Sequence, residues 1–261
     1  MRASGAGLGV IPARFGSTRF QGKPLVRVRG MTLVEHAYRR VAEARGVGRV
    51  VVATDEPRVA EAVRAFGGEA QLSRASYRTG TDRVAEVARD VGAELVANLQ
   101  LDQPFLSPAA IAAALEALAH APSFAMSTLV RAVPCAEARA DRDGVTVAVA
   151  ADGRCLYFSR AVLPPEGLAP EEEGAARWVF QHIGLYCYRR AFLQELAARP
   201  PSRLEQVEGL EQLRALEAGA DILAVPTGEA SFCFHRPEEL AAAEAFLARE
   251  ERESPWRVTS S

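Results

Sequence analysis

The residues best suited to chemistry lie close to the N-terminus, in the segment IPARFGSTRFQGKPL at 11–25. An apolar run ends at Ile11, and the residues after it include three cations, Arg14, Arg19 and Lys23. Three cations on one loop repel one another unless an anion lies among them, and the small residues between them let backbone N–H groups approach it. A triphosphate fits this description. The same composition is also common in solvated turns, and the segment is neither a Walker A loop nor a GxGxxG motif.

A carboxylate follows a later apolar run, in the segment ANLQLDQP at 97–104. Asp102 comes at the end of this run, and Gln100 lies two residues back, on the same face of an extended chain. A carboxylate at the end of a strand can hold a hard divalent cation against phosphate oxygens. An Asp before a Gln-Pro pair is about as often a turn former, so the residues alone leave both interpretations open.

Two further pairs of polar residues lie in the second half of the chain. His182 and Tyr186 share one face of the strand-like HIGLYCY, and Glu208 and Gln212 are four residues apart in LEQVEGLEQLR. A helix would present the second pair from one turn. A single His on a strand is usually a core residue, and Glu and Gln on a helix usually face solvent, so neither pair defines a site by itself.

The segment RASYRTGTDRVAEV at 74–87 marks the start of a helix. Thr81 or Asp82 can cap that helix, with Arg83 on its first turn, and Arg74 lies just upstream. From spacing alone, this pattern indicates a helix cap and nothing more.

Short apolar runs alternate with helical patterns through the first half of the chain. The apolar runs are at 8–13, 49–55, 69–73 and 94–102, and the helical patterns are at 31–46, 57–67, 81–92 and 108–121. Nearly continuous apolar runs are typical of strands covered on both faces, so they predict a doubly wound, mainly parallel α/β sheet. Such sheets bind ligands at the carboxyl ends of their strands.

The pattern changes after Phe124 to strands joined by turns, at 125–133, 145–160 and 182–190. Ala-Asp-Gly at 151–153 is a hairpin signal between two such runs. These runs predict an inserted, largely antiparallel subdomain near 125–190, with a mobile surface loop at 167–177. Helical patterns then return, the last one starting near 237, so we expect a single domain over 1–261.

The composition excludes several classes of protein. The chain has 261 residues, 49% of them hydrophobic and 25% charged, which is typical of a folded globular protein. Lys and Arg total 31 against 33 for Asp and Glu, so there is no basic excess for a nucleic-acid backbone. No apolar run reaches the ~18 residues of a membrane span. We expect a cytoplasmic protein without nucleic-acid or membrane partners, whose four scattered cysteines are reduced packing residues.

Several segments, in their order, resemble those of the 3-deoxy-D-manno-octulosonate (KDO) cytidylyltransferases, also called CMP-KDO synthetases. The first segment is close to that family's IPARxxSTRxxGKPL. The similarity continues through VVATDEPRVAEAV, GGEAQLSRASYRTGTDRVAEV, NLQLDQP, LYFSRAVLP, HIGLYCYRR and LEQVEGLEQLR. Acylneuraminate cytidylyltransferases share the fold but have a Gly-Ser-Lys-type loop. Sugar-1-phosphate and isoprenoid nucleotidylyltransferases have a glycine-rich turn where this chain has Arg14.

The resemblance implies a fold like that of nucleotide-diphospho-sugar transferases and a CTP-dependent reaction. CMP would be transferred from CTP to the anomeric hydroxyl of KDO or a KDO-like acid, with release of pyrophosphate, as in lipopolysaccharide biosynthesis. It also implies a homodimer formed through the inserted subdomain.

The resemblance further implies roles for individual residues. The catalytic residues would be Lys23, Arg19 and Asp102. The nucleotide contacts would come from Arg14, Ser17, Thr18, Lys23, Arg74, Thr81 and Gln100. The sugar contacts would come from Arg19, Gln100, His182, Tyr186, Glu208 and Gln212. A divalent metal, Mg²⁺, would be held by Asp102 and by the residue at position 235.

The sequence departs from the family around this metal. Where the family has a segment close to GVDTPEDL, this chain has CFHRPEEL, so His235 takes the place of an aspartate. A neutral imidazole is a poor ligand for Mg²⁺ but is acceptable to Mn²⁺, Zn²⁺ or Co²⁺, and of these Mn²⁺ is the alternative metal that we expect. The other departures near the site are Leu101, Gln103, Thr146, Cys233 and Arg236.

Two explanations of these departures remain open. In the first, the chain is an active cytidylyltransferase with an altered metal dependence, or with a different acceptor in a specialised pathway. In the second, it is a catalytically impaired homologue that binds a nucleotide or a sugar acid. The intact segment at 11–25 favours the first.

Overall fold

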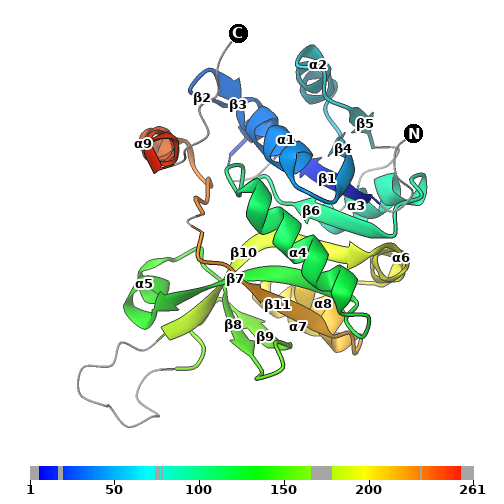
Figure 1. The fold of residues 1–261 in the computed structure, drawn as a ribbon, viewed down its shortest axis with the longest axis vertical. Coiled ribbons are helices and arrows are strands. Elements are labelled where there is room, and N and C mark those ends of the chain that lie inside the picture. The colour runs from blue at the N-terminus through cyan, green and yellow to red at the C-terminus, as the bar shows by residue number, and fades with distance from the viewer. Residues whose placement is uncertain are drawn as a thin grey trace.

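The computed structural model describes residues 6–16, 20–73, 77, 79–165, 178–229 and 231–253. Its centre is a nine-stranded sheet in the order β11-β7-β10-β6-β1-β4-β5, with the hairpin β8–β9 attached at β10 (Figure 1). On one side the strands run parallel: β6 (Leu95–Leu99), β1 (Gly7–Ala13), β4 (Val47–Thr54) and β5 (Ala70–Leu72). On the other side β7 (Met126–Pro134) and β11 (Ile222–Pro226) are parallel, and β10 (Trp178–Arg189) is antiparallel to β6 and β7. The predicted mixed, mainly parallel α/β sheet is confirmed.

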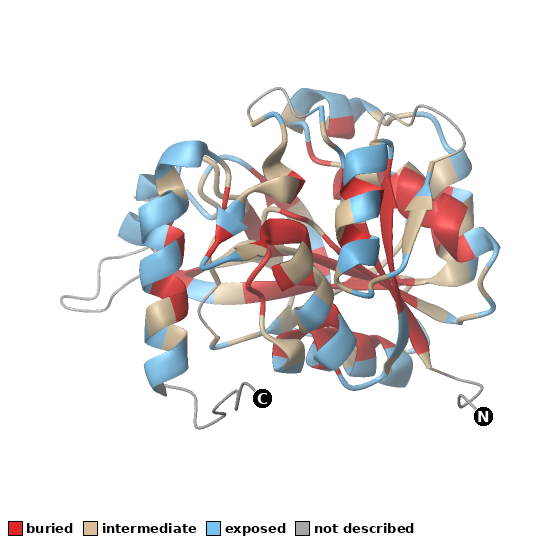
Figure 2. Ribbon diagram, turned by 90° about the horizontal axis from the view of Figure 1, so that it is seen from above, coloured by how far each residue is buried: buried red, intermediate tan, exposed pale blue. Residues whose placement is uncertain are grey.

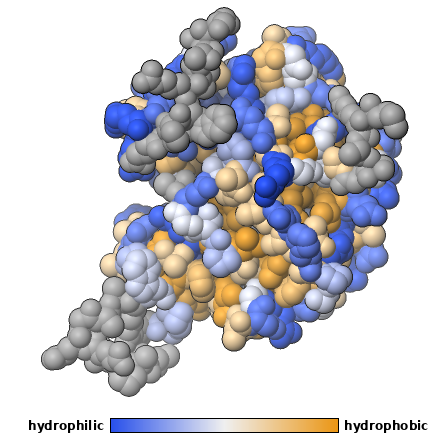
Figure 3. All heavy atoms as spheres, in the orientation of Figure 1, coloured by the Kyte–Doolittle hydropathy of each residue, from blue (hydrophilic) through white to orange (hydrophobic). Residues whose placement is uncertain are grey.

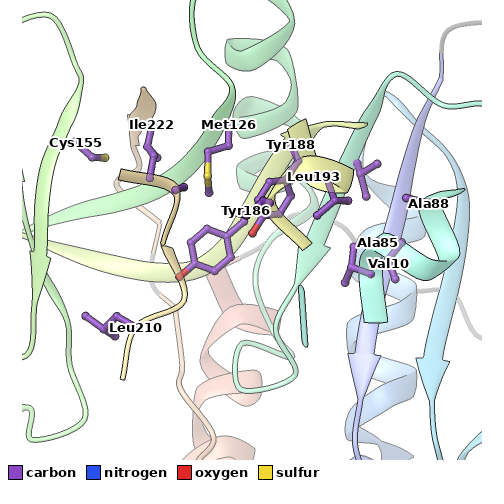
Figure 4. Close-up of a cluster of buried hydrophobic side chains, with 14 of the residues drawn as sticks. Val10, Ala85, Ala88, Met126, Cys155, Tyr186, Tyr188, Leu193, Leu210 and Ile222 are labelled. Carbon is purple, nitrogen blue, oxygen red and sulfur yellow. The ribbon is translucent and has the colours of Figure 1, made fainter. Parts of the chain in front are cut away.

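Helices cover both faces of this sheet. One face carries α1 (Leu33–Glu43), α2 (Pro57–Ala65) and α4 (Pro108–His120), and the other carries α3 (Gly80–Arg89) and α6 (Arg190–Ala198). In β1, Leu8 and Val10 pack toward the second face and Ile11 and Ala13 toward the first, all fully buried. The alternation explains why the strand is apolar throughout. Figure 2 shows the buried strands between partly exposed helices, and Figure 4 shows part of the core on the α3 and α6 face.

The strands of the 125–190 region are hydrogen-bonded into the main sheet. Beyond its pairing with β6, β10 continues along β7 and then beside β8 (Thr146–Val149), which pairs with β9 (Cys155–Ser159). The predicted hairpin between β8 and β9 is present, and its turn contains Gly153 with a φ of +84°. A short helix, α5 (Cys135–Ala140), follows β7. These elements form the lower left lobe in Figure 1. The predicted loop at 167–177 lies outside the described residues.

The end of the described chain returns to the centre of the molecule. After β11, residues 231–236 pass the end of β6, and α9 (Leu240–Glu253) follows a single 3₁₀ turn at Pro237–Glu239. Helix α9 packs in a separate apolar cluster that includes Phe105, Val28 and Leu33. Val28 lies in the small hairpin formed by β2 (Arg27–Val28) and β3 (Met31–Thr32). We call residues 231–236 the C-terminal strap.

Two expectations about helices are wrong in detail. Helix α3 is capped by Thr79, whose hydroxyl accepts from the backbone N–H of Asp82, so neither Thr81 nor Asp82 is the cap. The segment at 204–219 is two helices, α7 (Arg203–Glu208) and α8 (Gln212–Glu217), because Gly209 adopts a left-handed conformation with a φ of +66°. A glycine in that conformation ends a helix without steric cost.

The buried cysteines agree with the expectation of reduced packing residues. All four cysteines are free thiols, and Cys135, Cys155 and Cys187 are buried packing residues. Among the described residues, no helix has the length and apolarity needed to cross a membrane.

Candidate active site

A cavity of about 460 Å³ lies at the carboxyl ends of β1 and β6, where a doubly wound sheet binds its ligand. Its volume is within the range of small-molecule sites. The loop after β1, the start of α3, the turn after β6, β10, α8 and the C-terminal strap all contribute to its walls. Figure 3 shows the molecule indented between its upper body and the lower lobe of α5, β8 and β9. Eight of the predicted site residues line the cavity: Arg14, Lys23, Gln100, Asp102, His182, Tyr186, Gln212 and His235.

The segment from Arg14 to Lys23, which we call the cationic loop, closes on itself at one end of the cavity. The backbone N–H of Gly22 donates to the carbonyl of Phe15 at 3.0 Å, and Gly22 has a φ of +76°. This closure brings Lys23, which starts a 3₁₀ turn, back toward Arg14, which directly follows β1. Both cations line the cavity. The other predicted residues of this side, Ser17, Thr18, Arg19 and Arg74, lie outside the described residues.

Asp102 has the environment expected of a cation ligand. Its Oδ1 atom is buried without a hydrogen-bond partner within the described chain. The turn after β6 is closed by the backbone N–H of Gln103, which donates to the carbonyl of Gln100 at 3.0 Å. Across the cavity wall, a Cβ atom at Gly184 would lie 3.2 Å from this Oδ1 atom, so the glycine leaves room for the carboxylate. An unpaired buried carboxylate oxygen is costly unless a cation or donor reaches it.

The C-terminal strap brings His235 to the same cavity as Asp102. The backbone N–H of Phe234 donates to the carbonyl of Asp102 at 2.8 Å, which sets the strap against the turn after β6. Cys233 and His235, on either side of Phe234, line the cavity. Burial raises the pKa of the Cys233 thiol to about 12. No group of three or more His, Cys, Asp or Glu in the described ranges could hold a metal ion. The residues present therefore fit a metal held by Asp102 and by ligand oxygens, rather than a metal held by a complete protein cage.

His182 is neutral and its tautomer follows from its partners. Its Nε2 lies 2.9 Å from Thr128 Oγ1, and the Thr128 hydroxyl donates its single proton to the carbonyl of Leu185 at 2.7 Å. Thr128 must therefore accept from His182 Nε2–H, which leaves Nδ1 as an acceptor. Burial lowers the pKa of His182 to about 3. The imidazole stacks on the ring of Tyr186 with centroids 5.1 Å apart, so the predicted pair does lie together.

Glu208 is not part of the cavity wall, so the sugar contact expected of it stays a prediction. Its carboxylate accepts from the Ser159 hydroxyl at 3.0 Å and from the backbone N–H of Arg160 at 3.2 Å, which fixes α7 against β9. Because the chain turns at Gly209, Glu211 is the carboxylate that lines the cavity beside Gln212.

Thr81 also lies behind the cavity wall and not on it. It is 3% exposed, and its hydroxyl donates to Glu211 Oε2 at 2.6 Å. In this structure the hydroxyl is used to hold the Glu211 carboxylate, and the nucleotide contact expected of Thr81 stays a prediction. The two residues are 130 positions apart, so only the tertiary fold reveals this bond.

Two arginines of the cavity wall were not assigned a role from the sequence. Arg160, in the segment LYFSRAVLP, donates from Nε to the carbonyl of Glu208 at 3.1 Å and lines the cavity. Arg83, on α3, is 2% exposed and pairs with Asp55 at 3.0 Å. The quoted segments contained both residues, but spacing gave no reason to separate them from ordinary surface or helix arginines.

The fold and the cavity together define an α/β nucleotide-binding class, with cations and a carboxylate at the carboxyl ends of the strands. Residues 8–222 match the family model described as Cytidylyltransferase. The chain is 46% identical to a 3-deoxy-manno-octulosonate cytidylyltransferase of Syntrophotalea carbinolica, over 91% of this chain and 97% of that one. It is 44% identical to the protein of the same name from Geobacter sulfurreducens, over 88% of this chain and 95% of that one.

Solved structures agree with these relatives. A CMP:2-keto-3-deoxy-manno-octonic acid synthetase complexed with CTP has a TM-score of 0.85 and 38% identity, covering 94% of this chain and 99% of that one. A 2-C-methyl-D-erythritol 4-phosphate cytidylyltransferase from Thermus thermophilus, 22% identical over 95% of this chain and all of that one, shares the fold with a TM-score of 0.56. The chain belongs to the 3-deoxy-manno-octulosonate cytidylyltransferase family, and the resemblance drawn from its motifs is confirmed.

Proposed function

We propose that this chain transfers CMP from CTP to the anomeric hydroxyl of a 3-deoxy-2-ulosonate, KDO or a KDO-like acid, and releases pyrophosphate. The observation that carries the proposal is the convergence of Arg14, Lys23 and Asp102 on one cavity at the carboxyl ends of the strands. The family supports it, because its relatives carry this activity in their names. With this product, the chain would act in lipopolysaccharide biosynthesis, in the cytoplasm.

The cationic loop would hold the triphosphate. The hydroxyl oxygen attacks the α-phosphorus in line and its proton passes to water, while the bond from that phosphorus to the bridging oxygen breaks and pyrophosphate leaves with the electron pair. Transfers of this kind depend on positioning and on neutralising charge, which Lys23 and Arg14 can supply from one side of the cavity. Ser17, Thr18, Arg19 and Arg74 complete this nucleotide-binding and catalytic set in the proposal, together with Gln100.

The opposite side of the cavity would hold the sugar acid. His182 offers Nδ1 as an acceptor for a sugar hydroxyl, and Tyr186 and Gln212 lie on the same wall. Glu211 replaces Glu208 as the acidic sugar contact, held in place by Thr81. Arg160 adds a planar donor suited to the acceptor's carboxylate.

A divalent metal fits at Asp102, whose Oδ1 atom has no hydrogen-bond partner within the described ranges. When bound, Mg²⁺ would neutralise phosphate charge and orient the reacting oxygens. His235 approaches the same cavity and can contribute a nitrogen ligand, which suits Mn²⁺ better than Mg²⁺.

One observation favours the alternative, a catalytically impaired homologue that binds a nucleotide or sugar acid. The resemblance places an aspartate at position 235, where this chain has His235, so the metal would have one carboxylate fewer. Pyrophosphate release from CTP, measured with Mg²⁺ and then Mn²⁺ over a panel of ulosonates, separates the two. Release with at least one acceptor supports the enzyme, whereas CTP binding without release under every condition supports the impaired homologue.

We also propose that the chain forms a homodimer through the 125–190 region. Trp178, at the start of β10, is 60% exposed in the single chain, and Leu156 on β9 is 56% exposed. The resemblance to the family carries this proposal, and both exposed side chains lie in the region that the resemblance assigns to the interface. Light scattering at micromolar concentration tests this, since a stable monomer would contradict it.

A further inference from the structure

Arg83 is a buried cation of the cavity wall with an unused donor. The residue lies in the first turns of α3, is 2% exposed, and lines the cavity together with Thr79 and Gly80. Its Nη2 atom donates to Asp55 Oδ2 at 3.0 Å. Its Nη1 atom is buried without a hydrogen-bond partner among the described residues. A buried donor without a partner is costly, so its retention in a ligand cavity points to a ligand acceptor.

The charge of Arg83 is already balanced. Burial by itself would raise the pKa of the Asp55 carboxyl group. The hydrogen bond and the charge of Arg83 lower this pKa by more than burial raises it, so the pKa of Asp55 lies below its usual value. Asp55 is therefore ionised at neutral pH and forms a neutral pair with Arg83. A neutral pair with a spare NH2 group, Nη1, suits an uncharged carbonyl and ring nitrogen better than a phosphate. The phosphates have Arg14 and Lys23 on the neighbouring loop.

The surroundings of Arg83 suit a flat ring. Gly80 presents backbone without a side chain, and a Cβ atom there would lie 3.4 Å from Pro12 Cγ and 3.5 Å from the Gln100 amide. Glycine allows a ligand to approach the backbone closely. The phosphate-binding loop, Pro12 and the start of α3 thus form one continuous wall, along which a nucleotide can extend.

We infer that Arg83 recognises the base of the nucleotide. Its Nη1 group donates hydrogen bonds to the two acceptor atoms on one edge of a cytosine, O2 and N3. This inference rests on the proposed function, because it takes the ligand to be a pyrimidine nucleotide. Cytosine N3 is an acceptor, whereas uracil N3 carries a proton and would face the arginine N–H with a second donor. Arginine is protonated at every accessible pH and cannot become an acceptor, so the mismatch with uracil persists.

The test compares CTP with UTP in four proteins. Wild type, Arg83→Gln, Asp55→Asn and the matched control Arg89→Gln, an exposed position on the same helix, are assayed with one acceptor. Wild type should prefer CTP by kcat/KM. In Arg83→Gln the amide can donate or accept, so it can pair with either base. The ratio of kcat/KM for CTP to kcat/KM for UTP should fall about ten- to a hundredfold, mainly because KM for CTP rises. Asp55→Asn retains an acceptor for Nη2 and should keep the preference, as should Arg89→Gln.

A different result for Arg83→Gln would overturn the inference. If Arg83→Gln lowers the use of CTP and UTP by the same factor, Arg83 only supports the loop through Asp55, and the inference is overturned. Should Arg83→Gln fail to fold, Arg83→Lys keeps the charge beside Asp55, loses the planar fork, and should still lose part of the preference.

Calorimetric binding of CMP and UMP separates this inference from the proposed function. A wild type that releases no pyrophosphate but binds CMP more tightly than UMP, with the difference lost in Arg83→Gln, contradicts the proposed function and upholds the role of Arg83. Equal binding of CMP and UMP by wild type contradicts the role of Arg83.

Discussion

The backbone N–H of Phe234 donates to the carbonyl of Asp102 at 2.8 Å, across 132 residues of sequence, and this bond joins the C-terminal strap to the end of β6. Because of it, His235, which the resemblance aligns with an aspartate of the family, reaches the cavity that contains Asp102. If Asp102 holds a divalent metal, as we propose, the residue at position 235 is placed to affect the metal dependence.

Replacing His235 with aspartate should restore a second carboxylate near the metal. We expect His235→Asp to lower the Mg²⁺ concentration for half-maximal activity by about tenfold, because affinity for hard cations rises with the number of charged oxygen ligands. His235→Asn, which adds an oxygen without a charge, is the matched control and should change this concentration much less. If His235→Asp instead reduces activity at every Mg²⁺ concentration, the imidazole has a role of its own.

Removing the charge of Lys23 should slow the reaction strongly. We expect Lys23→Ala to lower kcat/KM by about 10²–10³, as the loss of one charge-stabilising donor does in other enzymes. Lys23→Arg keeps the charge and should retain more activity. Steady-state kinetics with CTP provide the test, and an unchanged kcat/KM would remove Lys23 from the site.

Gly184 should be needed to keep the Asp102 carboxylate in place. A Cβ atom at this position would lie 3.2 Å from both Asp102 Oδ1 and Gln103 Cγ. Gly184→Ala should therefore raise the metal concentration needed for activity and destabilise the fold by about 1–3 kcal/mol, the usual cost of overpacking. Gly92→Ala, where no heavy atom lies within 4 Å, is the control. Equal behaviour of the two variants in metal titration and urea unfolding would contradict this.

His182 should make the protein less stable at acidic pH. Its pKa is about 3 in the folded protein against 6.5 for the free group, so between these values only the unfolded chain binds the proton. Stability is therefore lost as pH falls through 6.5 toward 3. Between pH 7 and pH 5 this amounts to about 2 kcal/mol. Urea unfolding of wild type and His182→Gln at both pH values tests it, since a constant difference between the two proteins would mean that folding does not lower the pKa of His182.

Sequence patterns predicted the sheet well because its strands are local runs covered on both faces. Apolar runs alternate with helical patterns around β1, β4 and β6, and this alternation predicted a ligand site at the carboxyl ends of the strands. The cavity lies at the carboxyl ends of β1 and β6. The insertion of β10 between β6 and β7, antiparallel to both, depends on pairing between distant segments, which no local pattern encodes.

The positions of Glu208 and Thr81 beside the cavity depend on the tertiary fold, which local sequence patterns do not encode. Reading one helix through Gly209 put Glu208 beside Gln212, but the left-handed turn there moves Glu208 to β9 and leaves Glu211 in the cavity. The role of Thr81 depends on a bond to Glu211 from a distant helix. Arg83 was missed because its unpartnered Nη1 atom is visible only after folding.

The central claim is the formation of a bond between the acceptor's anomeric oxygen and the α-phosphorus of CTP. The most direct measurement is NMR of a reaction containing the purified protein, CTP, a divalent metal and KDO labelled with carbon-13 at C2. We expect a new C2 resonance coupled to phosphorus, which appears in step with free pyrophosphate. Unchanged KDO and CTP with both Mg²⁺ and Mn²⁺, or pyrophosphate without coupling at C2, would contradict it.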